Sequence, residues 1–200
     1  MELLYSDKDM VACVKPVGAD SEKDMPQMLA EELGGEFFTV HRLDMNVGGV
    51  MVYARTKAAA AELSRLIQDG KMIKEYLAEV KGIPPETGDW EDLLWKDQKK
   101  NKVFVVSRQR GGVKKARLEY RRISEGESSQ VLIRLHTGRS HQIRVQFASR
   151  GYPLLGDHKY GARDSRTAPA LFSCRISLPW QGSELAFSAL PPWASVQKMP

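Results

Sequence analysis

The sequence is poor in cysteine and in long apolar runs. Its two cysteines, Cys13 and Cys174, lie far apart, and neither has a second cysteine at C-x-x-C spacing. A disulfide framework and a zinc knuckle are therefore both disfavoured. No apolar stretch approaches the roughly 18 residues of a membrane-spanning helix, and the N-terminus lacks the cationic, apolar pattern of a secretory leader. We expect a cytoplasmic protein with two reduced thiols and no membrane association.

The motifs of several common enzyme classes are also missing. The chain has no P-loop, no dinucleotide-binding glycine fingerprint, no H-E-x-x-H and no nucleophile elbow. His136 and His141 bracket a turn, and no third ligand stands at metal-binding spacing from them. We therefore expect neither a metal nor a cofactor.

Cationic residues are concentrated in one segment. Residues 96–122 hold eleven Lys or Arg against Asp97 and Glu119, a net charge of +9 in a chain whose total is +5. Clustered cations provide most sequence-independent affinity for nucleic acids. A solvated hairpin with long cationic side chains would have the same composition. The segment thus favours a polyanionic partner without requiring one.

Periodicity predicts more strands than helices. Helical spacing and capping residues predict helices over residues 24–35, capped by Asp24, and 56–70. Residues 81–102, with Pro84, Pro85 and Gly88, are the least regular part and indicate a functional loop or a surface insertion. Alternating or continuous apolar residues predict strands over 10–16, 48–56, 74–82, 114–123 and 130–136.

One arginine raises a question of electrostatics. In HTGRSHQIRVQFASRG, residues 136–151, Arg144 stands between Ile143 and Val145 on an expected short helix. Such an arginine lies near the core, and a buried guanidinium is costly unless a carboxylate pairs with it. Asp44 of HRLDMNVGG is the best candidate, because it precedes a glycine-containing turn and a strand, where a scaffold can display a side chain. An aspartate there is also an ordinary turn former.

Three segments, read together, resemble a known family. HRLD at 41–44, KEYLAEV at 74–80 and HTGRSHQIRV at 136–145 are similar, in order and separation, to three motifs of the RluA-type pseudouridine synthases. The similarity continues through LLYSDKDMVACVKPVG, GYPLLGDHKYGA and LFSCRISLPWQGSELAFSALPPW, and it covers nearly the whole chain. The resemblance implies an α+β fold, with a mixed, mostly antiparallel β-sheet and flanking helices. We expect one catalytic domain over residues 1–200, without the accessory N-terminal RNA-binding domain of many relatives.

The resemblance also implies an activity and its residues. The reaction is isomerisation of specific uridines in structured RNA, a ribosomal or transfer RNA stem-loop, and it needs no cofactor. By resemblance, Asp44 is the catalytic aspartate, Tyr76 lies against the target base, and Arg144 pairs with Asp44 and keeps it ionised. Asp44 could attack the sugar, attack the base or remove a sugar proton. The target nucleotide must be flipped out of the RNA, although Tyr76 could also be an ordinary core tyrosine.

Three further cations are expected to contact RNA. Arg42 is placed to hold a phosphate or the displaced strand, and Arg139, in the TGRS loop at a helix start, suits a phosphate. Lys15, beside Pro16, matches a lysine-proline segment of the family that lines the cleft. Each of them could instead be a surface cation. The enzyme is expected to act as a monomer.

The sequence departs from the family pattern at one place, and two functions other than an enzyme are compatible with it. Val47, Gly48 and Gly49 stand where the family commonly has Thr-Ser-Gly, and glycine is an adequate replacement if the lost hydroxyls only shape the turn. The first rival is a non-catalytic RNA-binding protein or RNA chaperone on the same fold, for which Asp44 would be dispensable. The second is a structural or protein-interaction domain, which would show no RNA affinity that falls with salt.

Overall fold

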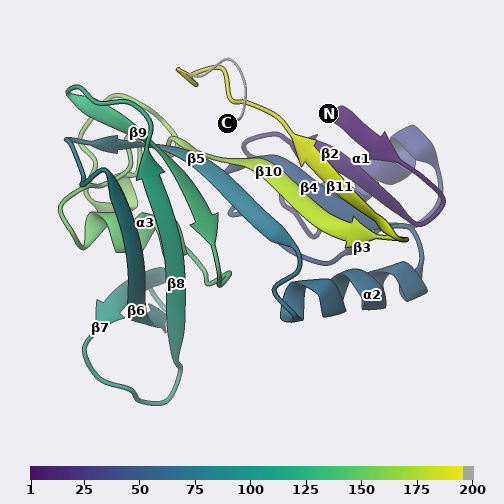
Figure 1. The fold of residues 1–200 in the computed structure, drawn as a ribbon, viewed down its shortest axis with the longest axis horizontal. Coiled ribbons are helices and arrows are strands. Elements are labelled where there is room, and N and C mark those ends of the chain that lie inside the picture. Colours follow the sequence, from purple (N-terminus) through teal and green to yellow (C-terminus); the bar gives the residue numbers. More distant parts are fainter. Residues whose placement is uncertain (196–200) are drawn as a thin grey trace. The chain divides into compact units, whose positions relative to one another are not determined.

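A computed structural model describes residues 1–195, and the chain divides into two compact units (Figure 1). The first unit consists of Met1–Glu75 together with Phe172–Pro200, and the second of Tyr76–Leu171. The expectation that residues 1–200 form a single domain stays a prediction.

The first unit is a mixed sheet with two helices. Its elements are β1 (Glu2–Ser6), β2 (Met10–Lys15), α1 (Asp24–Leu33), β3 (Phe38–Thr39), β4 (Gly48–Ala54), α2 (Lys57–Gln68), β10 (Leu171–Trp180) and β11 (Ser183–Ser188). The strand order is β1-β2-β4-β10, with β3 paired to β4 and β11 to β10. The strands pair antiparallel, except that β4 and β10 run parallel.

Helix α2 covers one face of this sheet, as its sequence predicts. Thr56 caps the helix, because its hydroxyl oxygen accepts a hydrogen bond from the Ala59 amide at 3.1 Å. The apolar side chains of α2 lie three to four positions apart and so share one face. They pack in a cluster of buried residues formed by Met10, Ala12, Val50, Val52, Ala54, Ala59, Leu63, Leu66, Met72, Ile176, Leu178, Trp180 and Phe187.

The glycine pair at the start of β4 is explained by the close approach of β10. Gly49 has φ of +127°, and a Cβ at this position would overlap the backbone nitrogen and oxygen of Ser173. A Cβ on Gly48 would lie 3.1 Å from the Lys15 carbonyl oxygen, which is tight but requires only a small shift. Glycine is therefore required at position 49, while at position 48 it relieves crowding.

The second unit is built around antiparallel pairs. Its elements are β5 (Ile73–Lys81), which begins at the end of the first unit, β6 (Thr87–Asp97), β7 (Lys102–Val106), β8 (Val113–Arg122), β9 (Ser128–Leu135), α3 (Gln142–Ala148) and the 3-10 turn η1 (His158–Tyr160). The order is β5-β9-β8-β6-β7, and β8 pairs antiparallel with β9. The expected mixed, mostly antiparallel sheet with flanking helices is thus confirmed. No helix among the described residues is long and apolar enough to cross a membrane.

Two local predictions were wrong. Most of the supposedly irregular segment 81–102 is strand β6, which pairs with β8 from Thr87 to Trp95, because the two prolines precede the strand and do not interrupt it. Asp24 is the first residue of α1, not its cap, and its carboxylate accepts a hydrogen bond from the Asp20 amide.

The two cysteines are both free and buried in the first unit. Burial is the main cause that raises the pKa of each thiol, Cys13 and Cys174, to about 12. A thiol that stays protonated is a poor nucleophile and a poor metal ligand, so both side chains are packing groups.

Candidate active site

The HRLD loop of the first unit is held by buried hydrogen bonds at two residues that precede its aspartate. His41 is buried, and its Nε2 accepts a hydrogen bond from the Val52 amide at 3.1 Å. The buried Ser21 hydroxyl donates to the Leu43 carbonyl at 3.0 Å and accepts from the Leu43 amide at 3.1 Å. Asp44 follows directly, with a half-buried side chain.

Lys15 supports the same loop from within the first unit. Its side chain is fully buried, and its ammonium donates to the carbonyl oxygens of Pro16 at 3.0 Å, Ala19 at 2.7 Å and Met45 at 3.2 Å. Burial lowers the pKa of this ammonium to about 8, an effect that nearby carboxylates partly oppose. An ammonium has three donors, so all of them are used on backbone carbonyls, one of which belongs to Met45, the residue after Asp44.

Arg144 of α3, in the second unit, is paired with Asp157. The Arg144 Nε lies 2.7 Å from the Asp157 Oδ2, and its Nη2 lies 2.8 Å from Oδ1. The two residues are only 6% and 1% exposed. A two-point, charge-assisted pair of this kind fixes the plane of the guanidinium as well as its position. The carboxylate that a buried Arg144 requires is thus present on the residue directly before η1.

Tyr160 packs beside this buried pair. The Arg144 Cζ lies 5.2 Å from the centroid of the Tyr160 ring. The Tyr160 hydroxyl oxygen lies 2.8 Å from His141 Nδ1 and accepts a hydrogen bond from the Val103 amide at 2.8 Å. Tyr160 therefore ties the start of α3 and strand β7 to the Arg144–Asp157 pair.

Gln142 anchors the TGRS loop on β8. Its Oε1 accepts hydrogen bonds from the Thr137 hydroxyl at 2.8 Å and the Arg139 amide at 3.0 Å, and its Nε2 donates to the Arg117 carbonyl at 3.1 Å. The Arg139 Nε donates to the Lys115 carbonyl at 2.9 Å. The conformation of the loop is therefore fixed, and the Arg139 side chain is bound to the backbone of β8 at Lys115.

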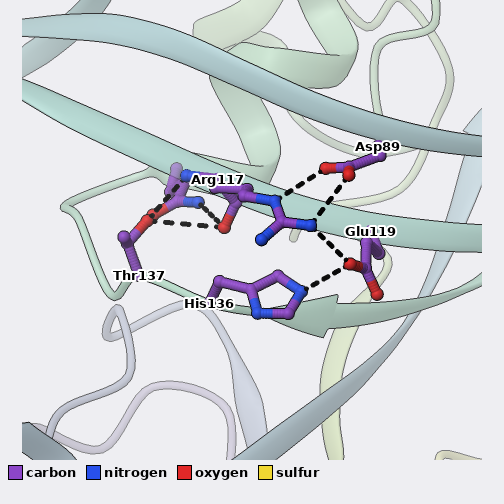
Figure 2. A network of polar contacts seen from close by, with 6 residues as sticks. Asp89, Arg117, Glu119, His136 and Thr137 are labelled. Atoms are coloured by element: carbon purple, nitrogen blue, oxygen red, sulfur yellow. Dashed lines mark hydrogen bonds and ion pairs between the residues drawn. The ribbon is translucent and has the colours of Figure 1, made fainter. Parts of the chain in front are cut away.

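An exposed network lies next to this loop (Figure 2). Arg117 donates from Nε and Nη2 to the two carboxylate oxygens of Asp89, at 2.9 and 2.8 Å, and Nη2 also lies 2.8 Å from Glu119. His136 Nε2 lies 3.0 Å from the same Glu119 oxygen. Across residues 1–195, no group of three or more His, Cys, Asp or Glu side chains is arranged to hold a metal ion.

Comparison with known families and proteins gives consistent matches. Residues 8–149 match the family model described as RNA pseudouridylate synthase. The dual-specificity RNA pseudouridine synthase RluA of Escherichia coli (strain K12) is 31% identical over 203 residues, which cover 94% of this chain and 91% of that protein. The protein of the same name from Yersinia pestis is 34% identical over 179 residues, which cover 83% of this chain and 84% of that protein.

This chain belongs to the RNA pseudouridine synthase family. It is of the RluA type, and its reaction is the isomerisation of uridine in RNA. Solved structures share the fold of the synthase. Human RNA pseudouridylate synthase domain containing 1 aligns with a TM-score of 0.85 at 21% identity, covering 96% of this chain and 84% of that one. Human RNA pseudouridylate synthase domain containing 4 aligns with a TM-score of 0.82 at 24% identity, covering 96% of this chain and 89% of that one.

The residues predicted to form the site of this synthase are divided between its two units. Asp44 and Arg42 lie in the first unit, and the exposed Arg42 guanidinium pairs with Glu22 at 2.8 Å. Tyr76 and Arg144 lie in the second unit, where Tyr76 is buried on β5. The pairing of Asp44 with Arg144 joins residues of different units and stays a prediction.

Sequence reasoning missed the residues that position this machinery in the synthase. Asp157 and Tyr160 lie in GDHKYG, a segment that supports the resemblance but to which no role was given. The need of Arg144 for an acid was correct, and Asp157 was an available acid only 13 positions away. Ser21 and Gln142 carry no distinctive pattern, because their roles depend on backbone groups that tertiary structure brings to them.

The buried pair of the synthase predicts a large cost for Asp157→Asn. The change removes one carboxylate of a buried ion pair, and we expect the free energy of unfolding to fall by about 3 to 5 kcal/mol. Urea unfolding of the purified protein measures this. Asp89→Asn is the matched control, because Asp89 also binds an arginine at two points but is exposed. Equal losses in the two variants would contradict the role assigned to burial.

The neutral His41 predicts lower stability of the synthase in mild acid. Burial lowers the pKa of His41 from 6.5 to about 3. The unfolded chain therefore takes up the proton first, and the stability that His41 contributes is complete above pH 6.5 and lost as the pH falls towards 3. Between pH 7 and pH 5 the free energy of unfolding should drop by about 2 kcal/mol on this account.

His41→Gln separates this effect from other titrations of the synthase. The amide oxygen can still accept the hydrogen bond from Val52, but the side chain does not titrate. Urea unfolding at the two pH values should show a smaller drop for the variant than for the wild type. The same drop in both proteins would show that His41 is not the source.

Proposed function

We propose that this enzyme converts specific uridines of a ribosomal or transfer RNA stem-loop to pseudouridine, with the Asp44 carboxylate as the catalytic group. In this isomerisation the bond from the sugar to the base nitrogen breaks and a bond to a base carbon forms. That carbon loses a proton and the nitrogen gains one, so atoms balance without a co-reactant. An ionised carboxylate can serve as a nucleophile or as a base.

Each remaining site residue has a proposed task. Arg144 pairs with Asp44, Tyr76 lies against the flipped base, and Arg42 and Arg139 bind phosphates of the RNA. Lys15 acts through its three backbone carbonyl partners, by fixing the loop that carries Asp44. Flipping the nucleotide costs a few kcal/mol, which stacking and phosphate contacts offset.

The observation that carries this proposal is the buried, two-point pairing of Arg144 with Asp157. A guanidinium held so rigidly is preorganised, and preorganised charge costs no reorganisation during a reaction. The rigid HRLD loop supports the proposal in the same way, because Ser21 and Lys15 leave little freedom to the backbone at Asp44.

The choice of RNA and the cellular setting belong to the same proposal. The Escherichia coli relative is named a dual-specificity enzyme, which supports a site that accepts more than one RNA. We propose a monomer that works in the cytoplasm, and the free thiols of Cys13 and Cys174 agree with a reducing compartment.

The test is conversion of uridine by the purified protein. Total ribosomal and transfer RNA made without pseudouridine is incubated with the enzyme, digested to nucleosides and analysed for pseudouridine by mass spectrometry after chemical labelling. Wild-type protein should form pseudouridine at a small number of positions. Asp44→Asn should lower the rate by at least about a thousandfold, as expected for loss of a catalytic carboxylate.

Two controls keep the outcome specific. Asp69→Asn changes an exposed carboxylate of the same unit and should leave conversion unchanged. Thermal unfolding and RNA binding of Asp44→Asn should match the wild type. If wild type and Asp44→Asn bind RNA equally and neither converts uridine, the non-catalytic RNA-binding function replaces the proposed one.

A further inference from the structure

The sheet formed by β6, β7 and β8 has two chemically different faces. Leu94, Val103 and Ala116 lie on one face and are buried against Val145 of α3. Directly opposed residues of neighbouring strands share a face, and successive residues of one strand alternate between faces. The outer face, away from α3, therefore carries the residues adjacent to these. They are Leu93 and Trp95 of β6, Lys102 and Phe104 of β7, and Lys115 and Arg117 of β8. Val113, opposite Trp95, and Glu91, opposite Arg117, lie on the same face.

Two aromatic rings on the outer face each have a cation beside them. Phe104 is 36% exposed, and its ring lies 6.2 Å from that of its cross-strand partner Trp95. The Lys102 Nζ lies 5.8 Å from the Phe104 ring centroid, and the Arg110 Cζ lies 4.9 Å from that of Trp95. Lys115 is exposed beside them. The rings of Phe104 and Trp95 therefore lie close to several positively charged side chains.

The cations of this region are mostly not neutralised by the protein itself. Residues 98–118 contain eight Lys or Arg and no Asp or Glu. Lys115 and Arg117 pair with acids. For Lys99, Lys100, Lys102, Arg108, Arg110 and Lys114, the described part of the chain provides no ion pair within 4.0 Å. A surface with this excess of positive charge fits a polyanion.

We propose that the outer face of β6, β7 and β8 binds the substrate RNA beside the target nucleotide. An unpaired base stacks on Phe104, while Lys102, Arg110 and Lys115 contact phosphates. This inference rests on the proposed function and names the surface that holds its substrate. Cations alone would also fit a solvated hairpin, but an exposed aromatic ring among them, that of Phe104, is typical of surfaces that bind single-stranded nucleic acid.

A contact within the second unit links this face to the residues around Arg144. The Lys102 Nζ also lies 5.4 Å from the centroid of the Tyr160 ring, and the same ring contacts the Arg144 guanidinium. RNA bound along the outer face would therefore contact Lys102, which lies next to Tyr160, the residue that packs on Arg144.

The experiment compares two surface variants with two matched controls. Dissociation constants are measured by fluorescence anisotropy, over a series of salt concentrations, with a labelled RNA hairpin that has an unpaired, uridine-containing loop. Phe104→Ala should weaken binding by about tenfold, the loss typical of one stacked base. Lys115→Ala should weaken binding and lower the slope of log Kd against log salt by about one.

The controls lie off the proposed surface in the same unit. Ile83→Ala removes another exposed apolar side chain, which is 52% exposed. Lys114→Ala removes the neighbouring exposed cation of β8, which is opposite Leu94 and so lies on the α3 face. Both controls should bind like the wild type, and circular dichroism should show the same thermal unfolding for all four variants.

The outcomes separate this inference from the proposed function. If wild-type protein converts uridine while Phe104→Ala and Lys115→Ala bind RNA as tightly as it does, the outer face is not the RNA surface and a protein partner becomes the better occupant. Equal weakening of RNA binding by Lys114→Ala and Lys115→Ala would also overturn this inference, because binding would then depend on the overall positive charge and not on one face. If RNA binding depends on the outer face but no pseudouridine forms, the surface stands and the proposed function fails.

Discussion

The arginine buried on α3 is the constraint around which the second unit is arranged. A guanidinium that leaves water requires a carboxylate and filled hydrogen-bond positions, and Asp157 meets it at two points. That requirement fixes the residue directly before η1 and brings Tyr160 against the guanidinium. Through the Tyr160 hydroxyl it also reaches β7 at Val103. One ion pair thereby connects a helix, a turn and a strand, and it holds a positive charge in a fixed direction.

The first unit fixes its loop by different means. His41, Ser21 and Lys15 all act on backbone groups, through an imidazole nitrogen, a hydroxyl and an ammonium. Burial keeps the imidazole neutral, because it lowers the pKa of His41 to about 3. The loop is therefore rigid at neutral pH, and the carboxylate of Asp44 is carried on a backbone with little freedom. Rigid support of this kind is what a catalytic group needs to keep its geometry.

Much of the fold follows from local pattern, and what does not follow depends on tertiary contacts. Helix α2 was predictable because Thr56, Leu63 and Leu66 satisfy capping and spacing at once. Strand β6 was missed because polar and apolar residues do not alternate regularly along it and two prolines precede it, so its sequence has no clear strand pattern. The need of Arg144 for an acid could be read from its neighbours. The identity of Asp157 could not, since periodicity says nothing about which turn folds back onto a helix.

The central claim is that a rigidly held Arg144 serves the isomerisation of uridine. Its most direct test is the release of tritium, in a single turnover, from RNA labelled at the carbon of uracil that becomes bonded to the sugar. Wild-type protein should release the label, and Arg144→Lys, which keeps the charge but loses the two-point geometry, should release it much more slowly while it folds and binds RNA normally. Release at the wild-type rate by a folded Arg144→Lys, or no release by the wild type, would contradict the claim.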